Sequence, residues 1–297
     1  MIVDEFIKYL RIERNYSKYT LKNYELDIND YINFCSDRNL DIYKVSYNYI
    51  KKYLIYMYDK KYKASSISRK ISSLRAFYKY LYDKELVNKN IFKYISLPKK
   101  EKKLPKYITN EDVDIIFNIP NINTPIGIRN RLILELLYGT GIRVSELCNI
   151  KLEDINFSEK SIRILGKGSK ERVVLYGTFC EKMLKLYLDE GRNILLNGKS
   201  NNYLIVGSNK KDKPITTRSI ELIIDNIIKE AALNKNVTPH VLRHTFATHL
   251  LNEGCDILIV KELLGHSSLD TTGIYTHVSN ERLRKVYLDS HPRAKKG

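Results

Sequence analysis

The sequence predicts a mainly α-helical protein with a small antiparallel β-sheet in its second half. Three observations support this fold class. Apolar residues recur at helical spacing through most of the chain, and two short β-branched runs flank a glycine-rich turn at 166–171. A charged segment between prolines interrupts the pattern near residue 104, and 297 residues are enough for two ordinary domains.

The charged segment at 97–106 reads LPKKEKKLPK and marks the expected domain boundary. Proline interrupts a helix and a run of charges resists burial, so such a segment is typical of an exposed linker. We therefore expect a helical domain at 1–100, a linker at 101–106 and a second domain at 107–297.

The first domain is expected to be helical throughout. Ser17 is a suitable N-cap for a helix whose apolar stripe runs from Leu21 to Cys35. A later helix has a second apolar stripe from Ile67 to Leu81. Basic side chains fall largely off that second stripe, namely Arg69, Lys70, Arg75 and Lys79.

The net charge of +17 favours a polyanionic partner, because each Lys or Arg that meets a phosphate releases a counterion. Residues 1–103 hold 23 Lys and Arg against 12 Asp and Glu, which gives this smaller part +11 of the total. It also holds 16 of the 23 tyrosines, for which core packing is the simpler role and contact with sugar–phosphate the other. We predict that this domain binds DNA. The alternative is that its positive charge serves solubility alone.

Several protein classes are disfavoured by the composition. No run of about 18 apolar residues occurs, and the start, with Asp4 and Glu5, lacks the basic and apolar stretches of a signal peptide. We expect a soluble, cytoplasmic protein with no membrane partner. The cysteines form no CxxC pair, which disfavours disulfides and zinc fingers. They are Cys35, Cys148, Cys180 and Cys255.

The second domain is expected to mix helices with a hairpin. Thr109 and Asp112 have the spacing of a capping box, and a helix at 129–138 is closed by glycines. Ser161–Leu165 and Arg172–Tyr176 are the predicted strands of the hairpin. Beyond residue 214 the pattern returns to helix.

Histidines are confined to the last part of the chain, at 240, 244, 249, 266, 277 and 291. Thr238, followed by proline, predicts a helix start that places His240 and Arg243 on one face of the first turn. A helix N-terminus favours an anion, so an imidazole and a guanidinium there form a candidate phosphate site. His244 and His249 are interpreted as packing residues.

Four further side chains stand in notable positions. Arg143 follows a glycine-rich turn at the mouth of a predicted helix, where a guanidinium can bind phosphate, and Lys167 lies at the hairpin tip. His266 follows Gly265 on a turn, and Tyr275 comes soon after. Taken singly, these would be a capping arginine, a solvated lysine, a turn histidine and a structural tyrosine. Their order and closeness favour one site, because the groups from residue 240 to 275 fall within 36 residues.

Together these residues resemble the active-site signature of the phage integrase family, the tyrosine recombinases. The set is Arg143, Lys167, His240, Arg243, His266 and Tyr275. The segments that carry the resemblance are GTGIRVSEL, GKGSKER, HVLRHTFATHLL, LLGHSSLDTT and IYTHV, and it extends over nearly the whole chain. Within the family the chain is similar to bacterial Xer recombinases of the XerC and XerD type, which resolve chromosome and plasmid dimers. Its size and the ending HPRAKKG support that subfamily.

The resemblance implies a two-domain architecture, with a helical core-binding domain and an α+β catalytic domain. It implies that Tyr275 attacks a phosphodiester to form a 3′-phosphotyrosyl link and release a 5′-hydroxyl. The two arginines would clamp the nonbridging oxygens and His266 would add a hydrogen bond. Lys167 would be the general acid and His240 would assist proton transfer. No metal, ATP or other cofactor is implied.

The implied partners are a double-stranded DNA recombination site and a related recombinase, in a homo- or heterotetramer, with a DNA translocase as a further candidate. The segment 282–288, with Leu283, Val286 and Tyr287 as its apolar side, is the candidate protomer contact. The alternative is that this segment docks on its own domain. Candidate DNA contacts are Arg69, Arg75, Lys79 and Arg218.

Four other functions remain open at this point. The chain could be the integrase or excisionase of a mobile element, which shares the chemistry. It could be a type IB topoisomerase-like enzyme, which uses a similar nucleophile, or a non-catalytic DNA-binding protein. A metal-dependent nuclease is disfavoured because Arg243 stands among the clustered histidines.

Overall fold

The computed structural model describes the whole chain except residues 15, 97–106, 167–170, 209, 266–279 and 295–297. The chain divides into an N-terminal unit, Met1–Lys103, and a C-terminal unit, Leu104–Gly297, each with its own hydrophobic core. Both are mainly helical, and the second contains a three-stranded antiparallel sheet, which confirms the predicted fold class.

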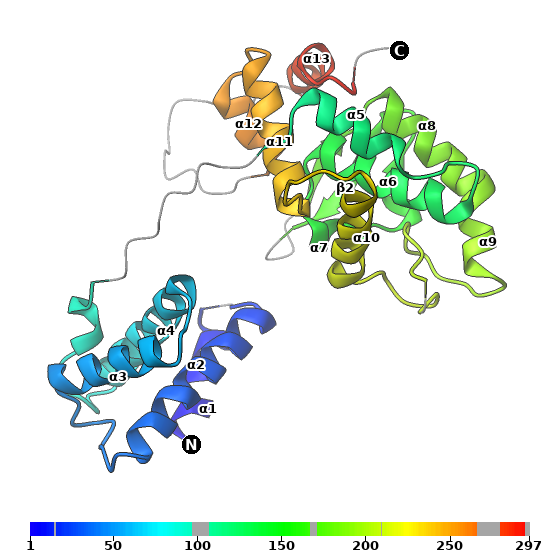
Figure 1. The fold of residues 1–297 in the computed structure, drawn as a ribbon. Coiled ribbons are helices and arrows are strands. Elements are labelled where there is room, and N and C mark those ends of the chain that lie inside the picture. The colour runs from blue at the N-terminus through cyan, green and yellow to red at the C-terminus, as the bar shows by residue number, and fades with distance from the viewer. Residues whose placement is uncertain (15, 97–106, 167–170, 209, 266–279, 295–297) are drawn as a thin grey trace. The chain divides into compact units, whose positions relative to one another are not determined.

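The N-terminal unit, blue to cyan in Figure 1, is helical, as predicted. Its elements are α1 (Ile2–Ile12), α2 (Lys18–Ser36), α3 (Tyr47–Asp59), α4 (Ala64–Asp83) and the short 3-10 helix η1 (Ile91–Tyr94). Ser17 caps α2 as expected, because its hydroxyl accepts a hydrogen bond from the Thr20 N–H at 3.2 Å. Helix α2 packs against α1 and α4, so the predicted apolar stripes form one core.

A buried polar network joins α2 to α4. Asp27, only 1% exposed, pairs with Arg69 and accepts a hydrogen bond from Ser73 Oγ at 2.8 Å. Lys70 Nζ lies 3.0 Å from Asp30 Oδ2. The interpretation of Lys70 as a residue outside the apolar stripe is therefore wrong: it is 6% exposed, and buried carboxylates on α2 supply the partners that a buried ammonium needs.

The C-terminal unit, green to red in Figure 1, surrounds a largely buried central helix, α6. It opens with α5 (Asn110–Asn118), α6 (Pro125–Thr140), α7 (Val144–Leu147), η2 (Leu152–Asp154), β1 (Ile155–Asn156), β2 (Ser161–Leu165) and β3 (Glu171–Leu175). It continues with α8 (Thr178–Leu186), the π-helical turn η4 (Tyr187–Gly191), α9 (Arg192–Leu196), α10 (Thr217–Glu230), α11 (Pro239–Asn252), α12 (Ile257–Leu263) and α13 (Asn280–Ser290).

Local signals placed most of these elements, but α6 begins at Pro125, before the predicted start at 129, and continues through Gly139 to Thr140. The capping box of Thr109 and Asp112 starts α5, and the Thr238 hydroxyl accepts from the Val241 N–H at the start of α11. Strand β3 begins one residue earlier than expected, so that Ile164 pairs with Arg172 across the hairpin. The four cysteines are free and buried. In the part of the chain that the structure describes, no helix has the length and apolar character needed to span a membrane.

Lowering the pH from 7 to 5 is expected to destabilise the C-terminal unit through His291. This side chain is fully buried among aromatic rings, and burial, followed by repulsion from His249 and Arg293, lowers its pKa to about 3. In an unfolded chain histidine titrates near 6.5. Below about pH 6.5 the unfolded state therefore binds a proton at this histidine and the folded state does not. This lowers the free energy of unfolding by about 2 kcal/mol at pH 5.

Urea denaturation of the wild type and of His291→Phe at pH 7 and pH 5 measures this contribution. The wild type should lose about 2 kcal/mol more between these pH values than the variant does. His244→Gln, a change at a half-buried histidine of α11, is the control variant. Equal losses in the wild type and His291→Phe would contradict the assignment.

Candidate active site

Arg143 lies at the start of α7, directly after a tight turn at Gly141. Gly141 has φ +62°, and a side chain there would collide with Phe246 and Leu264. The backbone N–H of Arg143 donates to Glu146 Oε2 at 2.8 Å, and its Nη1 donates to Glu146 Oε1 at 2.9 Å. The arginine is thus the N-cap residue of α7, as predicted, and its side chain remains 42% exposed.

Glu146 joins Arg143 to a second arginine, Arg172 on β3. Arg172 Nη1 donates to Glu146 Oε1 at 2.9 Å and Nη2 donates to Oε2 at 2.8 Å, a bidentate pair. The sequence reasoning missed both residues. A signal for Glu146 was present, because it follows Arg143 by three residues, the spacing of a capping box. For Arg172, the only signal in the sequence was its position two residues before Val174, a buried residue on the same face of the strand.

Arg243 lies in the first turn of α11, as predicted, but it is buried. Its Nη1 donates to the carbonyl oxygen of Gly141, and its Nη2 donates to the carbonyl of Leu264 at 2.8 Å. It therefore ties the ends of α6 and α12 together beside Arg143. His240, three residues earlier on the same helix, is exposed.

Electrostatically, these residues act as one cluster. Burial raises the pKa of Glu146, but the hydrogen bonds from Arg172 and Arg143 outweigh it and hold that pKa at about 2. Burial, and next the repulsion from Arg143 and Arg172, lowers the pKa of Arg243 to about 10. At neutral pH the three guanidinium groups and one carboxylate leave positive charge in excess, which suits a bound phosphate.

Three residues of the predicted set, Lys167, His266 and Tyr275, lie outside the described residues. Described residues next to Lys167 and His266 in the chain border the cluster. Strands β2 and β3 lie on either side of residues 167–170 in the chain, and β3 begins one residue before Arg172. Gly265, which precedes His266, has φ +66° and packs against the Arg172 side chain.

His249 has the packing role expected for it. Its Nδ1 lies 2.7 Å from the Tyr138 hydroxyl oxygen and its Nε2 lies 3.0 Å from the Ile108 carbonyl oxygen. The Thr245 hydroxyl also accepts the N–H of Ile108 at 3.2 Å. Helix α11 therefore holds the chain just after the predicted linker.

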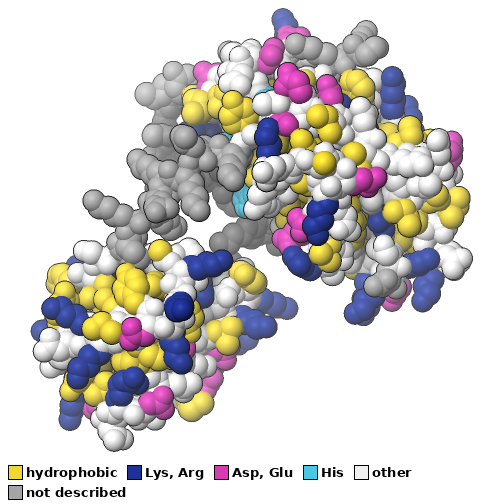
Figure 2. Space-filling view, in the orientation of Figure 1, with side chains coloured by type: hydrophobic (Ala, Val, Ile, Leu, Met, Phe, Trp, Pro, Cys, Tyr) yellow, Lys and Arg dark blue, Asp and Glu magenta, His cyan; other side chains and the backbone are white. Residues whose placement is uncertain are grey.

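The four candidate DNA contacts differ in how free their side chains are. Arg69 pairs with Asp27, and Arg75 donates to the backbone carbonyls of the η1 region, at 3.2 Å and 2.9 Å. These contacts give Arg75 a structural role. Lys79, by contrast, is exposed. Arg218 is 70% exposed, with Glu221 at 3.4 Å. Figure 2 shows Lys and Arg side chains spread over the visible face of the N-terminal unit, with apolar side chains between them.

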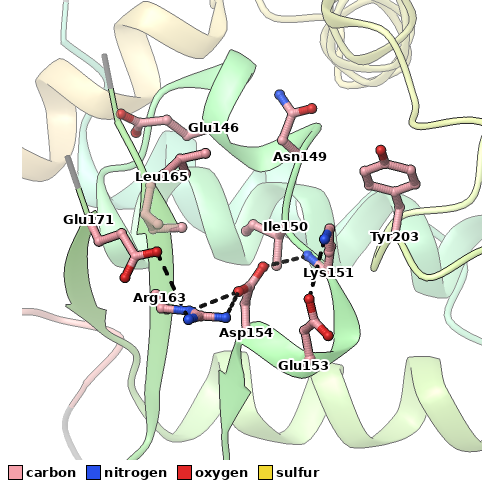
Figure 3. A pocket seen from close by; sticks show the side chains of 11 residues that line it. Glu146, Asn149, Ile150, Lys151, Glu153, Asp154, Arg163, Leu165, Glu171 and Tyr203 are labelled. Atoms are coloured by element: carbon pink, nitrogen blue, oxygen red, sulfur yellow. Dashed lines mark hydrogen bonds and ion pairs between the residues drawn. The ribbon is translucent and has the colours of Figure 1, made fainter. Parts of the chain in front are cut away.

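A hollow of about 310 Å³ lies on the outer side of the sheet, and Figure 3 shows its lining. Arg163 Nη2 lies 3.0 Å from Asp154 Oδ1, and Lys151 Nζ lies 3.3 Å from Glu153 Oε1. Its charged groups thus pair with one another. Glu146 borders it, but the carboxylate of Glu146 is already occupied by the two arginines.

Comparison with known proteins identifies the family. Residues 106–282 match the phage integrase family, and residues 3–85 match its N-terminal SAM-like domain. The chain belongs to the phage integrase family. A tyrosine recombinase XerC of Staphylococcus epidermidis is 45% identical over 100% of this chain and 99% of that protein. A tyrosine recombinase XerC of Anoxybacillus flavithermus is 44% identical over 97% of each chain.

A solved structure of a family member has a similar fold. It is the XerH site-specific recombinase bound to difH substrate in a pre-cleavage complex, with 25% identity and a TM-score of 0.68, covering 95% of this chain and 82% of that one. The resemblance inferred from the sequence motifs is confirmed. This protein is accordingly a tyrosine recombinase, an enzyme that transfers DNA strands at specific sites.

Proposed function

We propose that this tyrosine recombinase acts as a Xer-type enzyme that resolves chromosome or plasmid dimers at a short recombination site. The full-length likeness to relatives named XerC supports this role. The chemical part of the proposal rests on one observation, the closeness of the partly exposed Arg143 and the buried Arg243, whose charges repel each other beside the turn at Gly141. Such a pair of guanidinium groups fits the nonbridging oxygens of a phosphodiester.

In the proposed cleavage step, the phenol oxygen of Tyr275 forms a bond to phosphorus and the bond from phosphorus to the 5′ oxygen breaks. The phenol gives up its proton with the help of His240, and the leaving oxygen takes a proton from Lys167. A phenol has an ordinary pKa of about 10, so the attack needs a positive field to favour the phenolate.

The arginine cluster supplies that field. Negative charge accumulates on the nonbridging oxygens as Tyr275 attacks, and in this proposal Arg143 and Arg243 stabilise it, with His266 as a further donor. The phosphotyrosyl link retains the free energy of the phosphodiester. Attack by a 5′-hydroxyl therefore rejoins a strand without ATP.

Strand exchange joins two duplexes, so we propose four protomers on paired sites, made of this chain alone or with a related recombinase. A DNA translocase is a further candidate partner. Helix α13 packs against α11 of its own unit, and the Tyr287 hydroxyl donates to the Gly139 carbonyl at 2.7 Å. The segment 282–288 is thus docked on its own domain in the single chain, and its contact with a second protomer stays a proposal.

Incubation with DNA in EDTA tests the proposed function. The substrate is a nicked duplex whose site has been selected from random DNA by binding to this protein. We expect a covalent protein–DNA complex on a denaturing gel, and resolution of a plasmid that carries two direct copies of the site into two circles. A protein that binds the site but only relaxes supercoiled plasmid would instead act as a topoisomerase.

A further inference from the structure

Arg172 touches two structural supports of the proposed active site. Its guanidinium forms the bidentate pair with Glu146, whose other hydrogen bonds come from Arg143. Its side chain also lies against Gly265, where a Cβ would meet Arg172 Cδ and Nε at 2.4 Å. Arg172 therefore links the support of Arg143 to the end of α12, one residue before His266.

The position of Arg172 follows from strand alternation. Arg172 pairs with buried Ile164 on the inner face of the hairpin, whereas Arg163 pairs with exposed Val173 on the outer face. Only 18% of the Arg172 side chain is exposed. The Arg172 Nε is buried and has no hydrogen-bond partner among the described residues. Within that part of the chain, the Arg172 guanidinium donates through its two Nη groups to Glu146.

The pair with Arg172 also determines how Glu146 binds Arg143. Both carboxylate oxygens accept from Arg172, and Arg143 contributes a single guanidinium nitrogen, Nη1, to the carboxylate. Arginine has five N–H donors. Among the described residues the Arg143 guanidinium makes no other hydrogen bond, so its remaining edge is available to a phosphate. Without Arg172, the carboxylate would compete with the phosphate for a bidentate contact with Arg143.

We infer that Arg172 is a positioning residue for strand cleavage. It keeps the Glu146 carboxylate from forming a bidentate pair with Arg143, and it supports the turn at Gly265. This inference rests on the proposed function. Arg172 is not a catalytic residue in this account, because it acts through Glu146 and through the backbone before His266.

Single-turnover cleavage of the selected, nicked duplex tests this inference. Four proteins are compared with the wild type: Arg172→Met, Arg172→Lys, the double variant Arg172→Met with Glu146→Gln, and the control Arg163→Met. Arg163 is a matched control because it lies in the same hairpin and forms an ion pair, with Asp154, but faces the hollow in Figure 3. Thermal unfolding of each variant separates loss of fold from loss of positioning.

We expect Arg172→Met to cleave about 100-fold more slowly, the effect typical of a displaced catalytic group. The DNA concentration for half-maximal cleavage should change by less than about 3-fold, because binding of the ground state is spared. Adding Glu146→Gln should raise the rate at least about 10-fold above that of Arg172→Met, since a neutral amide competes less for Arg143. Arg172→Lys should recover little, because an ammonium cannot replace the bidentate fork.

Two results would overturn the inference while leaving the proposed function intact. One is a folded Arg172→Met or Arg172→Lys protein that cleaves at the rate of Arg163→Met. The other is a further loss of rate, in place of rescue, when Glu146→Gln is added. If the wild type binds the selected duplex but forms no covalent complex, the proposed function fails and the inference fails with it.

Discussion

Replacing Arg243 by lysine is expected to slow strand cleavage by about 1,000-fold, the upper range for removal of one transition-state donor. Lysine keeps the charge, but its three donors sit on one nitrogen and cannot reproduce the planar fork that spans the Gly141 and Leu264 carbonyls and still faces a phosphate. Buried carbonyls that lose their donors also cost about 1–3 kcal/mol each. The measurement is single-turnover formation of the covalent complex, corrected for the folded fraction.

Arg192→Lys is a matched control for this experiment. Arg192 is also buried and also donates to backbone carbonyls, those of Leu204, Tyr203 and Asn201, at 3.3, 2.8 and 2.7 Å. Its replacement should reduce stability in a similar way but leave the cleavage rate of the folded protein nearly unchanged. Equal loss of rate in the two variants would show that Arg243 matters only for the fold.

Replacing Arg293 by alanine is expected to destabilise the C-terminal unit by about 3–5 kcal/mol. Its guanidinium donates to both oxygens of Glu135 at 2.8 Å and 2.5 Å, and it lies over the rings of Phe117 and Phe179. Glu135 is 1% exposed, so the variant leaves a buried carboxylate with Arg131 as its remaining ion-pair partner among the described residues. Urea denaturation followed by circular dichroism measures the loss.

Two further variants test the cause of this destabilisation. Lys185→Ala removes an exposed lysine whose partner Glu181 keeps its pair with Lys160, and it should cost less than about 1 kcal/mol. Combining Arg293→Met with Glu135→Gln removes both charges of this pair, leaves an amide oxygen to accept from Arg131, and should recover much of the stability, because no buried carboxylate remains. If the double variant is as unstable as Arg293→Ala, packing over the rings and not charge pairing holds the C-terminal end.

Features that depend on neighbours in the chain were predictable from the sequence. Ser17, Thr109 and Thr238 each cap a helix because a short polar side chain precedes the first turn, and no distant residue is needed. The hairpin was found from β-branched alternation around a glycine turn, with an error of one residue in β3. The position of Arg143 at a helix start followed from the turn at Gly141.

Features that depend on distant partners were not predictable. The burial of Lys70 requires Asp27 and Asp30, about forty residues earlier on another helix. Arg172 meets Glu146 only because the hairpin folds back beside α7, and no local pattern encodes that contact. The motif resemblance led to the proposed catalytic set because it carries information from related chains. It did not show which groups hold those residues in place.

The identity of the nucleophile is tested most directly by mapping the covalent adduct. The wild type and Tyr275→Phe are incubated in EDTA with the selected nicked duplex, the complex is digested with protease and nuclease, and the nucleotide-bearing peptide is identified by mass spectrometry. We predict a single adduct on Tyr275, joined to a 3′ phosphate, and no adduct in the variant, which should still bind the DNA. An adduct on another residue, a link to a 5′ phosphate, or a complex that persists in Tyr275→Phe would contradict this account.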